Sequence, residues 1–228
     1  MDIKGNIAEV RQEIAAAAAR SGRSDSVIKI IAVTKTISVD KIKLALEGGI
    51  GALGENRVQE MTSKIPDLPE SVEWHLIGHL QSNKVKYIAG RVGMIHSLDS
   101  LSLAGEIDRQ GKRLGRRVPV LVQVNVAGET TKFGLAPGEV TDFITELSGY
   151  TGLAVSGLMT VAPYVTDPEE VRPVFRELGE LSGRLKKMDI PGIRMDYLSM
   201  GMSNDYKVAV EEGANLLRIG SRIFGERY

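Results

Sequence analysis

Residues 28–36 read IKIIAVTKT, and this segment has the composition of a short buried β-strand that ends in a lysine. Its isoleucines and Val33 are β-branched and form an almost continuous apolar run, which is typical of a strand in a parallel sheet. Lys35 follows between two threonines, and the next segment, ISVDKIKLALEGG, has helical spacing. The sequence therefore predicts a core strand that carries a lysine at its carboxyl end.

The alternation of strand and helix continues along the chain. Strand patterns lie at 28–34, 50–53, 74–77, 94–97, 118–124, 153–158, 196–199 and 215–219, and helical patterns at 38–47, 56–64, 82–89, 100–114, 137–148, 168–187 and 204–212. Parallel strands joined by helical crossovers are expected from such alternation. Eight strands in 228 residues predict a (β/α)8 TIM-type barrel, with a doubly wound open sheet as the alternative. An extra helix over 2–20 precedes the first strand, and no linker divides residues 1–228, so we expect a single domain.

The composition excludes several classes of function. Lys plus Arg and Asp plus Glu both total 29, and a formal net charge of zero argues against general binding to a nucleic-acid backbone. The chain has no cysteine, which excludes disulfides, thiolate catalysis and cysteine-ligated metals. Charged residues interrupt the alanine-rich N-terminal segment, and no apolar run is long enough to span a membrane. We therefore expect a cytoplasmic protein with no membrane or nucleic-acid partner.

Two segments rich in glycine and serine follow the seventh and eighth strands, where barrels often bind phosphate. LSMGMSND places Ser199 and Gly201 before a helix, and RIGSRIFG places Gly220 and Ser221 directly after a strand. Small residues let backbone N–H groups approach an anion, and a helix N-terminus favours negative charge. In the alternative interpretation Ser203 or Asn204 caps a helix and Gly220 forms a turn. Two such segments after adjacent strands favour a phosphate site.

Lys35 and Arg218 are expected at the same end of the barrel as these segments. A lysine beside a phosphate site suggests a Schiff base to a phosphorylated aldehyde, whereas a lone lysine can also extend from the strand end into solvent. Arg218, in NLLRIG, either points to the mouth or pairs with a carboxylate inside the core. If it faced the ring nitrogen of a pyridine cofactor, its charge would disfavour protonation of that nitrogen.

Two further patterns do not support a site. GIGALG at 49–54 matches the spacing of a dinucleotide fingerprint, but a helix precedes it and a strand lies inside it, and Gly48 and Gly49 resemble a helix C-cap. His75, His79 and His96 occur without an HExxH pattern, so we expect no metal site.

Seven motifs, in order along the chain from about residue 28 to the C-terminus, resemble the YggS/PROSC family of pyridoxal-phosphate-binding homeostasis proteins. They are AVTKT, GENRVQE, WHLIGHLQSNK, HSLD, VQVNVAGETTKFG, GLMTVAP and LSMGMSNDYKVAVEEG…RIGSRIFGER. The resemblance implies a single barrel, similar to the N-terminal domain of alanine racemase, that holds pyridoxal 5′-phosphate (PLP) as a Schiff base on Lys35. It further implies phosphate contacts from Ser199, Gly201, Gly220 and Ser221, a pyridine-facing Arg218, and Asn56 beside the ring.

The resemblance also implies a carrier or buffer of PLP in the cell, with apo PLP-enzymes as candidate recipients. Alanine racemase adds a second domain and a tyrosine base from the partner subunit, whereas this sequence ends at Tyr228, directly after the eighth strand. We therefore expect a carrier without robust catalysis, and a monomer because the site is complete within one chain. A weak PLP-dependent amino-acid racemase and a Schiff-base aldolase without cofactor are the alternatives.

Overall fold

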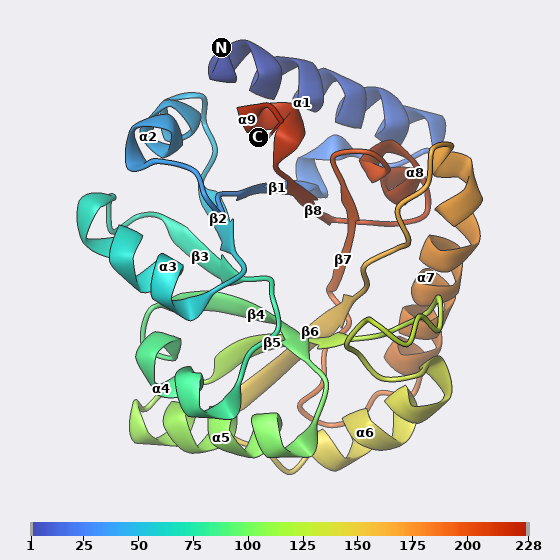
Figure 1. The fold of residues 1–228 in the computed structure, drawn as a ribbon. Coiled ribbons are helices and arrows are strands. Elements are labelled where there is room, and N and C mark those ends of the chain that lie inside the picture. The colour runs from blue at the N-terminus through green and yellow to red at the C-terminus, as the bar shows by residue number, and fades with distance from the viewer. Residues whose placement is uncertain (1, 227–228) are drawn as a thin grey trace.

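The computed structural model describes residues 2–226, and its strands close into one parallel barrel (Figure 1). The strands are β1 Lys29–Val33, β2 Ala52–Glu55, β3 Glu73–Leu76, β4 Val92–Leu98, β5 Val118–Gln123, β6 Leu153–Met159, β7 Tyr197–Met202 and β8 Leu216–Ile219. Each strand pairs with the next in chain order, and β8 pairs with β1, where Ile31 lies opposite Arg218. This arrangement confirms the predicted barrel and excludes the open doubly wound sheet.

Helices form a layer around the outside of the barrel (Figure 1). They are α1 Ile3–Arg20, α2 Val39–Glu47, α3 Val58–Lys64, α4 Val85–Ile88, α5 Leu101–Arg113, α6 Val140–Leu147, α7 Arg172–Lys187, α8 Tyr206–Glu211 and α9 Ser221–Phe224. The main apolar core lies between this layer and the strands, with fully buried side chains such as Ile42 of α2 and Phe175 of α7. None of the described helices combines the length and the hydropathy needed to cross a bilayer.

The first helix, α1, packs against the outside of the barrel beside α8 and α9, as the sequence predicts. Its buried residues recur every three or four positions: Ile3, Ile7, Val10, Ile14, Ala17 and Ala18. The side-chain amide of Asn6 donates to the carbonyl oxygen of Ile223 at 2.9 Å. The first helix, in blue, and the last short helix, in red, consequently lie side by side in Figure 1.

The inside of the barrel is partly apolar and partly polar. Six buried residues form its apolar cluster: Ile31, Ala52, Met94, Leu121, Met159 and Leu216. Four polar side chains are also buried and bonded to one another there: His75, His96, Ser199 and Arg218. Because side chains alternate along each strand, a polar residue two positions from an apolar inward one also points inward. The barrel therefore has a hydrogen-bonded interior that ends at its mouth.

Several strands run farther than the sequence pattern predicts, and two of them, β2 and β7, do so at the mouth of the barrel. β2, expected at 50–53, continues to Glu55, whose buried side chain accepts hydrogen bonds from Thr34 and Lys64. β7, expected at 196–199, continues through a glycine to Met202. The motif GIGALG (49–54) begins after the C-cap of α2 and runs into β2, so no helix opens at its last glycine and it lacks the context of a dinucleotide site.

Candidate functional site

A cavity of about 560 Å³ opens at the carboxyl ends of β1, β7 and β8. Its lining includes Lys35 after β1, Ser203, Asn204 and Asp205 after β7, Arg218 of β8, and Gly220 and Ser221 after that strand. The loops at this end of a parallel barrel are where active sites are built. The structure thus brings together Lys35, Arg218, Gly220 and Ser221, four of the residues predicted from the sequence.

Lys35 stands at a sharp turn just beyond β1, where its side chain is half-buried. Thr36, the next residue, has a φ of 63°, in the left-handed region that few non-glycine residues adopt. Its N–H donates to Oε1 of Glu60 on α3 at 2.5 Å, which holds this conformation. Among residues 2–226 the Lys35 ammonium makes no hydrogen bond or ion pair. Its Nζ is therefore left for a ligand in the cavity.

Residues of two loops line the same cavity, and several of their backbone N–H groups are unpaired. Those of Ser203, Asn204 and Ser221 have no acceptor in the part of the chain that the structure describes. The Ser203 hydroxyl joins the two loops, because it accepts from the N–H of Gly220 at 3.1 Å and of Arg222 at 3.4 Å. Free N–H donors at a helix start suit an acceptor-only anion. This donor set therefore fits a phosphate group.

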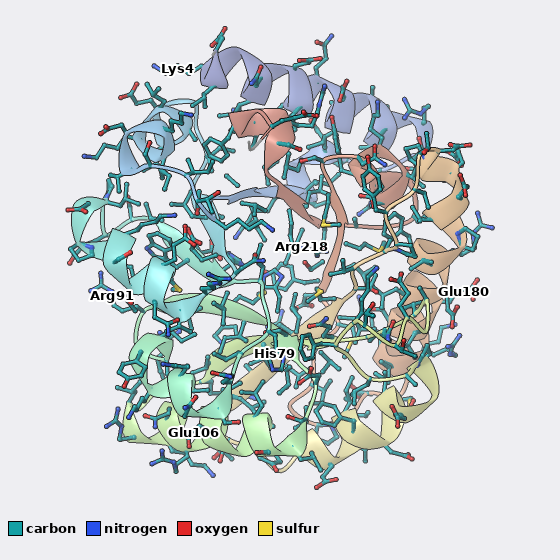
Figure 2. All side chains as sticks on the ribbon, viewed as in Figure 1. Lys4, His79, Arg91, Glu106, Glu180 and Arg218 are labelled. Atoms are coloured by element: carbon teal, nitrogen blue, oxygen red, sulfur yellow. The ribbon has the colours of Figure 1, made fainter. Side chains whose placement is uncertain are left out.

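Arg218 forms the floor of the cavity and lies within the ring of strands in Figure 2. Its Nη1 donates to Oγ of Ser199 at 2.6 Å, and its Nη2 donates to the carbonyl oxygen of Thr160 at 2.7 Å. Burial lowers the pKa of Arg218 to about 10, with Asp205 acting in the opposite direction, so the side chain is a cation at neutral pH. Two of its five N–H groups face the protein, which leaves donors for a ligand above it.

Asp205 places a carboxyl group on the cavity wall, near Arg218. It is 4% exposed, and burial raises its pKa, while the N–H of Met202 and the charge of Arg218 act to lower it. Its Oδ1 accepts from Met202 at 2.5 Å, and its own N–H donates to the Met202 carbonyl oxygen at 3.1 Å. These two bonds close the turn that presents the Ser203 and Asn204 amides to the cavity.

Ser199 and Gly201, predicted as phosphate contacts, lie below the cavity rather than on its lining. The Ser199 hydroxyl is bonded to Arg218 and to His96. Gly201 has a φ of 90°, and a Cβ there would lie 2.6 Å from the Cβ of Ala209 in α8. Gly201 thus allows α8 to pack closely on β7. The direct phosphate contacts predicted for these two residues remain predictions.

Asn56, predicted to lie beside a ring, follows β2 at the same end of the barrel but borders a different cavity, of about 230 Å³. His79 and Phe133 also line that cavity and stack with 3.8 Å between ring centroids and 14° between ring planes. Asn56 therefore lies at the same end of the barrel as Lys35 but lines a separate cavity, and its position beside the ring remains a prediction.

Sequence reasoning missed part of the cavity wall. For Ser203 the sequence suggests only a role as a helix cap, in the alternative interpretation, whereas its hydroxyl joins the loop after β7 to the loop after β8. Tyr164, in the segment after β6, also lines the cavity and is 90% exposed. The run of small polar residues after β7 was the available signal for the first, while nothing local marks the second.

A metal centre is not part of the described site. Within residues 2–226, no three or more His, Cys, Asp or Glu side chains are grouped in a way that could hold a metal ion. His75 and His96 are hydrogen-bonded to each other at 2.8 Å. The histidines of β3 and β4 are therefore bonding partners inside the barrel.

Comparison with known proteins shows the family to which the chain belongs. The family model for the alanine racemase N-terminal domain matches residues 6–228. The pyridoxal phosphate homeostasis protein of Aquifex aeolicus is 41% identical over 222 residues, 97% of this chain and 96% of that protein. The protein of the same name from Escherichia coli is 36% identical over 234 residues, 99% of this chain and 97% of that one. The chain belongs to the YggS/PROSC family of pyridoxal phosphate homeostasis proteins.

Solved structures agree with this family assignment. A protein of unknown function from Bifidobacterium adolescentis superposes with a TM-score of 0.93 at 33% identity, over 98% of this chain and 94% of that one. PipY of Synechococcus elongatus with PLP bound gives a TM-score of 0.81 at 34% identity, over 93% of this chain and all of PipY. Alanine racemase of Clostridium difficile shares the barrel fold at 17% identity, and the match covers 57% of that chain.

Proposed function

We propose that this YggS/PROSC family member binds PLP through Lys35 and the loops after β7 and β8, and that it acts as a carrier or buffer of PLP without robust catalysis. One observation carries the proposal: an unpaired lysine, a buried arginine and three residues with unpaired backbone N–H groups line one cavity. The names of the relatives and the PLP in the PipY structure support it.

In this proposal Lys35 forms the covalent link and the loops hold the phosphate. The neutral amine adds to the aldehyde carbon, a C=N bond forms, and the aldehyde oxygen leaves as water. The N–H groups of Ser203, Asn204 and Ser221 donate to the phosphate oxygens, and the hydroxyl of Ser221 adds another donor. Charge-assisted bonds of this kind are about twice as strong as neutral ones. The phosphate therefore provides most of the anchoring.

Arg218 faces the ring nitrogen in this proposal, with Asn56 beside the ring. Bound PLP supplies an electron sink for carbanion chemistry. A fixed cation disfavours a proton on the ring nitrogen, so the sink is weak. Ser199 acts from below by holding Arg218, and Gly201 acts by allowing the close packing of α8. These roles favour retention and exchange of the cofactor over chemistry on it.

A weak amino-acid racemase is the second candidate, and Tyr164 is the observation that favours it. Racemisation needs a proton donor or acceptor on the side of the substrate opposite to the lysine. Tyr164 borders the Lys35 cavity and could supply that group, although its 90% exposure leaves the phenol loosely held. The two candidates differ in whether amino acids turn over.

The test of the covalent link is reduction of PLP-loaded protein with borohydride, followed by peptide mapping. The label is expected on Lys35 and is expected to be absent in Lys35→Ala. Lys43→Ala is the matched control, because Lys43 is an exposed lysine on the helix that follows β1. A label on a different lysine would show that the cavity is not the cofactor site.

The test of the carrier function incubates PLP-loaded protein with an apo-enzyme that requires PLP and, separately, with a panel of L-amino acids. Activation of the apo-enzyme without turnover of the amino acids is expected. Racemisation that disappears in Lys35→Ala and falls in Tyr164→Phe would instead establish the enzyme.

The residues that line the proposed site come from one chain, and light scattering is expected to show a monomer. The cytoplasmic location and the apo-enzyme partners inferred from the sequence stay predictions.

A further inference from the structure

A chain of buried hydrogen bonds crosses the inside of the barrel and ends at Arg218. The Arg218 guanidinium donates to Oγ of Ser199 at 2.6 Å, and that oxygen lies 2.9 Å from Nδ1 of His96. Nε2 of His96 lies 2.8 Å from Nδ1 of His75, and Nε2 of His75 lies 3.0 Å from Oε1 of Glu73. Side chains of β8, β7, β4 and β3 are thereby joined in one line.

The donor at one end of this hydrogen-bond chain, together with a neutral His96, sets the direction of its bonds. A guanidinium can only donate, so the Ser199 oxygen accepts from Arg218. Among the described residues Nδ1 of His96 is the one acceptor bonded to this buried hydroxyl, so the hydroxyl hydrogen goes to His96. Burial and the charge of Arg218 hold the pKa of His96 well below its usual value, so the ring is neutral. Because its Nδ1 accepts from Ser199, its single proton is on Nε2 and points to His75. His75 then accepts at Nδ1 and carries its own proton on Nε2, toward Glu73.

The acceptor end lies at the opposite side of the barrel from the Lys35 cavity. Glu73 begins β3 and, with Lys29 at the start of β1, lines a separate cavity of about 550 Å³. The hydrogen bond from His75 and the contact with Lys29, at 2.7 Å, lower the pKa of Glu73 to about 2. The chain thus joins a buried cation at the mouth to a carboxylate at the far end, and all its bond dipoles align between them.

We propose that Glu73, His75, His96 and Ser199 are positioning residues, which hold the Arg218 guanidinium in one orientation toward the ring of the bound cofactor. The proposal rests on the proposed function for the identity of the ligand, but the chain itself is a property of the ligand-free protein. An arginine side chain has many rotamers, and its single bond to the Thr160 carbonyl oxygen would leave the guanidinium free to rotate about that contact. The bond to Ser199 gives the guanidinium a second fixed contact. The histidines hold the hydroxyl hydrogen of Ser199 toward His96, which keeps the serine oxygen free to accept from Arg218.

The first test determines, without ligand, which ring nitrogen of each histidine carries the proton. It uses two-bond nitrogen–proton NMR of protein labelled in its three histidines. His79→Gln removes the remaining histidine signal and completes the assignment. His75 and His96 are both expected as neutral tautomers protonated at Nε2, with slowly exchanging protons. A proton on Nδ1 of either ring, or a charged ring at neutral pH, would overturn the chain.

The second test changes the far end, which does not line the Lys35 cavity. Glu73→Leu removes the terminal acceptor, Glu73→Gln keeps an acceptor without charge, and Lys29→Gln leaves the carboxylate in place. Glu73→Leu is expected to weaken PLP binding about tenfold, as loss of an outer partner does at other built sites. It is also expected to shift the absorbance maximum of bound PLP, with partial rescue in Glu73→Gln and no change in Lys29→Gln.

Glu73 is half-exposed, so both variants at this position are expected to fold, and far-UV circular dichroism confirms this before binding is measured. Affinity and absorbance equal to wild type in Glu73→Leu, with borohydride label still on Lys35, would overturn the positioning role while leaving the proposed function intact. Failure of the wild-type protein to bind PLP would overturn the proposed function, and the NMR result would still decide whether the chain exists.

Discussion

Lys64 reaches from α3 into the wall of the barrel, where its ammonium is almost fully buried. Its Nζ donates to Glu55 at 2.8 Å, to Glu60 at 2.7 Å and to the carbonyl oxygen of Thr34 at 2.7 Å. Glu55 is the more buried carboxylate, and burial raises its pKa even though the bonds from Lys64 and Thr34 act to lower it. Glu60 also accepts from Thr36, so this buried cluster supports the turn that carries Lys35.

Removal of the Lys64 charge is predicted to cost much of the stability of the fold. Lys64→Met leaves Glu55 buried without its cation, and such a loss typically lowers the free energy of unfolding by about 3 kcal/mol. Urea unfolding at pH 7 measures it. The double variant Lys64→Met, Glu55→Gln is expected to recover part of the loss, because the unpaired charge is gone. A cost in Lys64→Met no larger than that of Lys43→Met, an exposed control, would contradict this prediction.

Glu73 is predicted to make stability depend on pH in the acid range. Its pKa is lowered to about 2 in the folded protein, so between pH 4.5 and 2 the unfolded chain binds more protons. Its contribution is therefore fully present above pH 4.5 and is lost as the pH falls toward 2. The shift alone corresponds to about 3 kcal/mol, and partial exposure of the carboxylate reduces this to about 1 kcal/mol.

The measurement compares Glu73→Gln with wild type by urea unfolding at pH 7, 4 and 3. The variant is expected to be less stable at pH 7, and the difference is expected to shrink at each lower pH. Glu70→Gln is the control, because Glu70 is exposed and makes no ion pair among the described residues. A difference that grows on acidification would show that the carboxylate is not stabilised by its partners.

At the scale of elements, two glycines of α5 differ in whether the helix can accept a methyl group at that position. A Cβ on Gly111 would lie 1.9 Å from the carbonyl oxygen of Gly152, in the loop before β6, whereas a Cβ on Gly105 would meet nothing within 4 Å. Both residues lie inside the helix Leu101–Arg113. The close approach of α5 to the loop before β6 therefore depends on Gly111 and not on Gly105.

Gly111→Ala is predicted to lower the free energy of unfolding by about 1–3 kcal/mol, because the helix must move away from the backbone that it touches. Gly105→Ala is predicted to raise it by about 0.5–1 kcal/mol, since alanine is the better helix former and the added methyl group is tolerated. Thermal unfolding of both variants checks the pair. Equal and favourable effects would mean that α5 can shift without cost.

The elements themselves were largely predictable, because apolar periodicity reports burial directly. The errors fall where a strand contains residues that usually mark a loop. Glu55 ended the predicted second strand too early because its buried partner, Lys64, lies on the next helix. The predicted seventh strand stopped at Ser199, short of Gly201, because glycine usually marks a turn, whereas here Gly201 stays in the strand and makes room for α8. Both residues were interpreted without knowledge of their spatial neighbours.

At the scale of the whole molecule, the site was predictable as far as strand order alone brings residues together. Lys35, Arg218, Gly220 and Ser221 each follow or end a strand, so the barrel prediction placed them at one mouth, and the structure gathers them in one cavity. The inner chain was not predictable. His96 and Ser199 are 103 positions apart, and their contact depends on which side chains point inward and on the size of the barrel interior.

The closed barrel is predicted to unfold as one unit, and PLP is predicted to stabilise all of it together. α1 packs on α8 and α9 near the last strand. Trp74, the single tryptophan, is buried in β3, which pairs with β2 and is separated from β1 by that strand. Tryptophan fluorescence and far-UV circular dichroism are therefore expected to give coincident transitions.

A ligand at 100 times its dissociation constant adds about 2.7 kcal/mol to the free energy of unfolding, which raises Tm by roughly 5–10 °C for a chain of this size. Both probes should shift equally with PLP, less with pyridoxal, which lacks the phosphate, and little in Lys35→Ala. Helical signal lost before fluorescence would instead divide the chain into separate units, and a full PLP shift in Lys35→Ala would place the stabilising contact elsewhere.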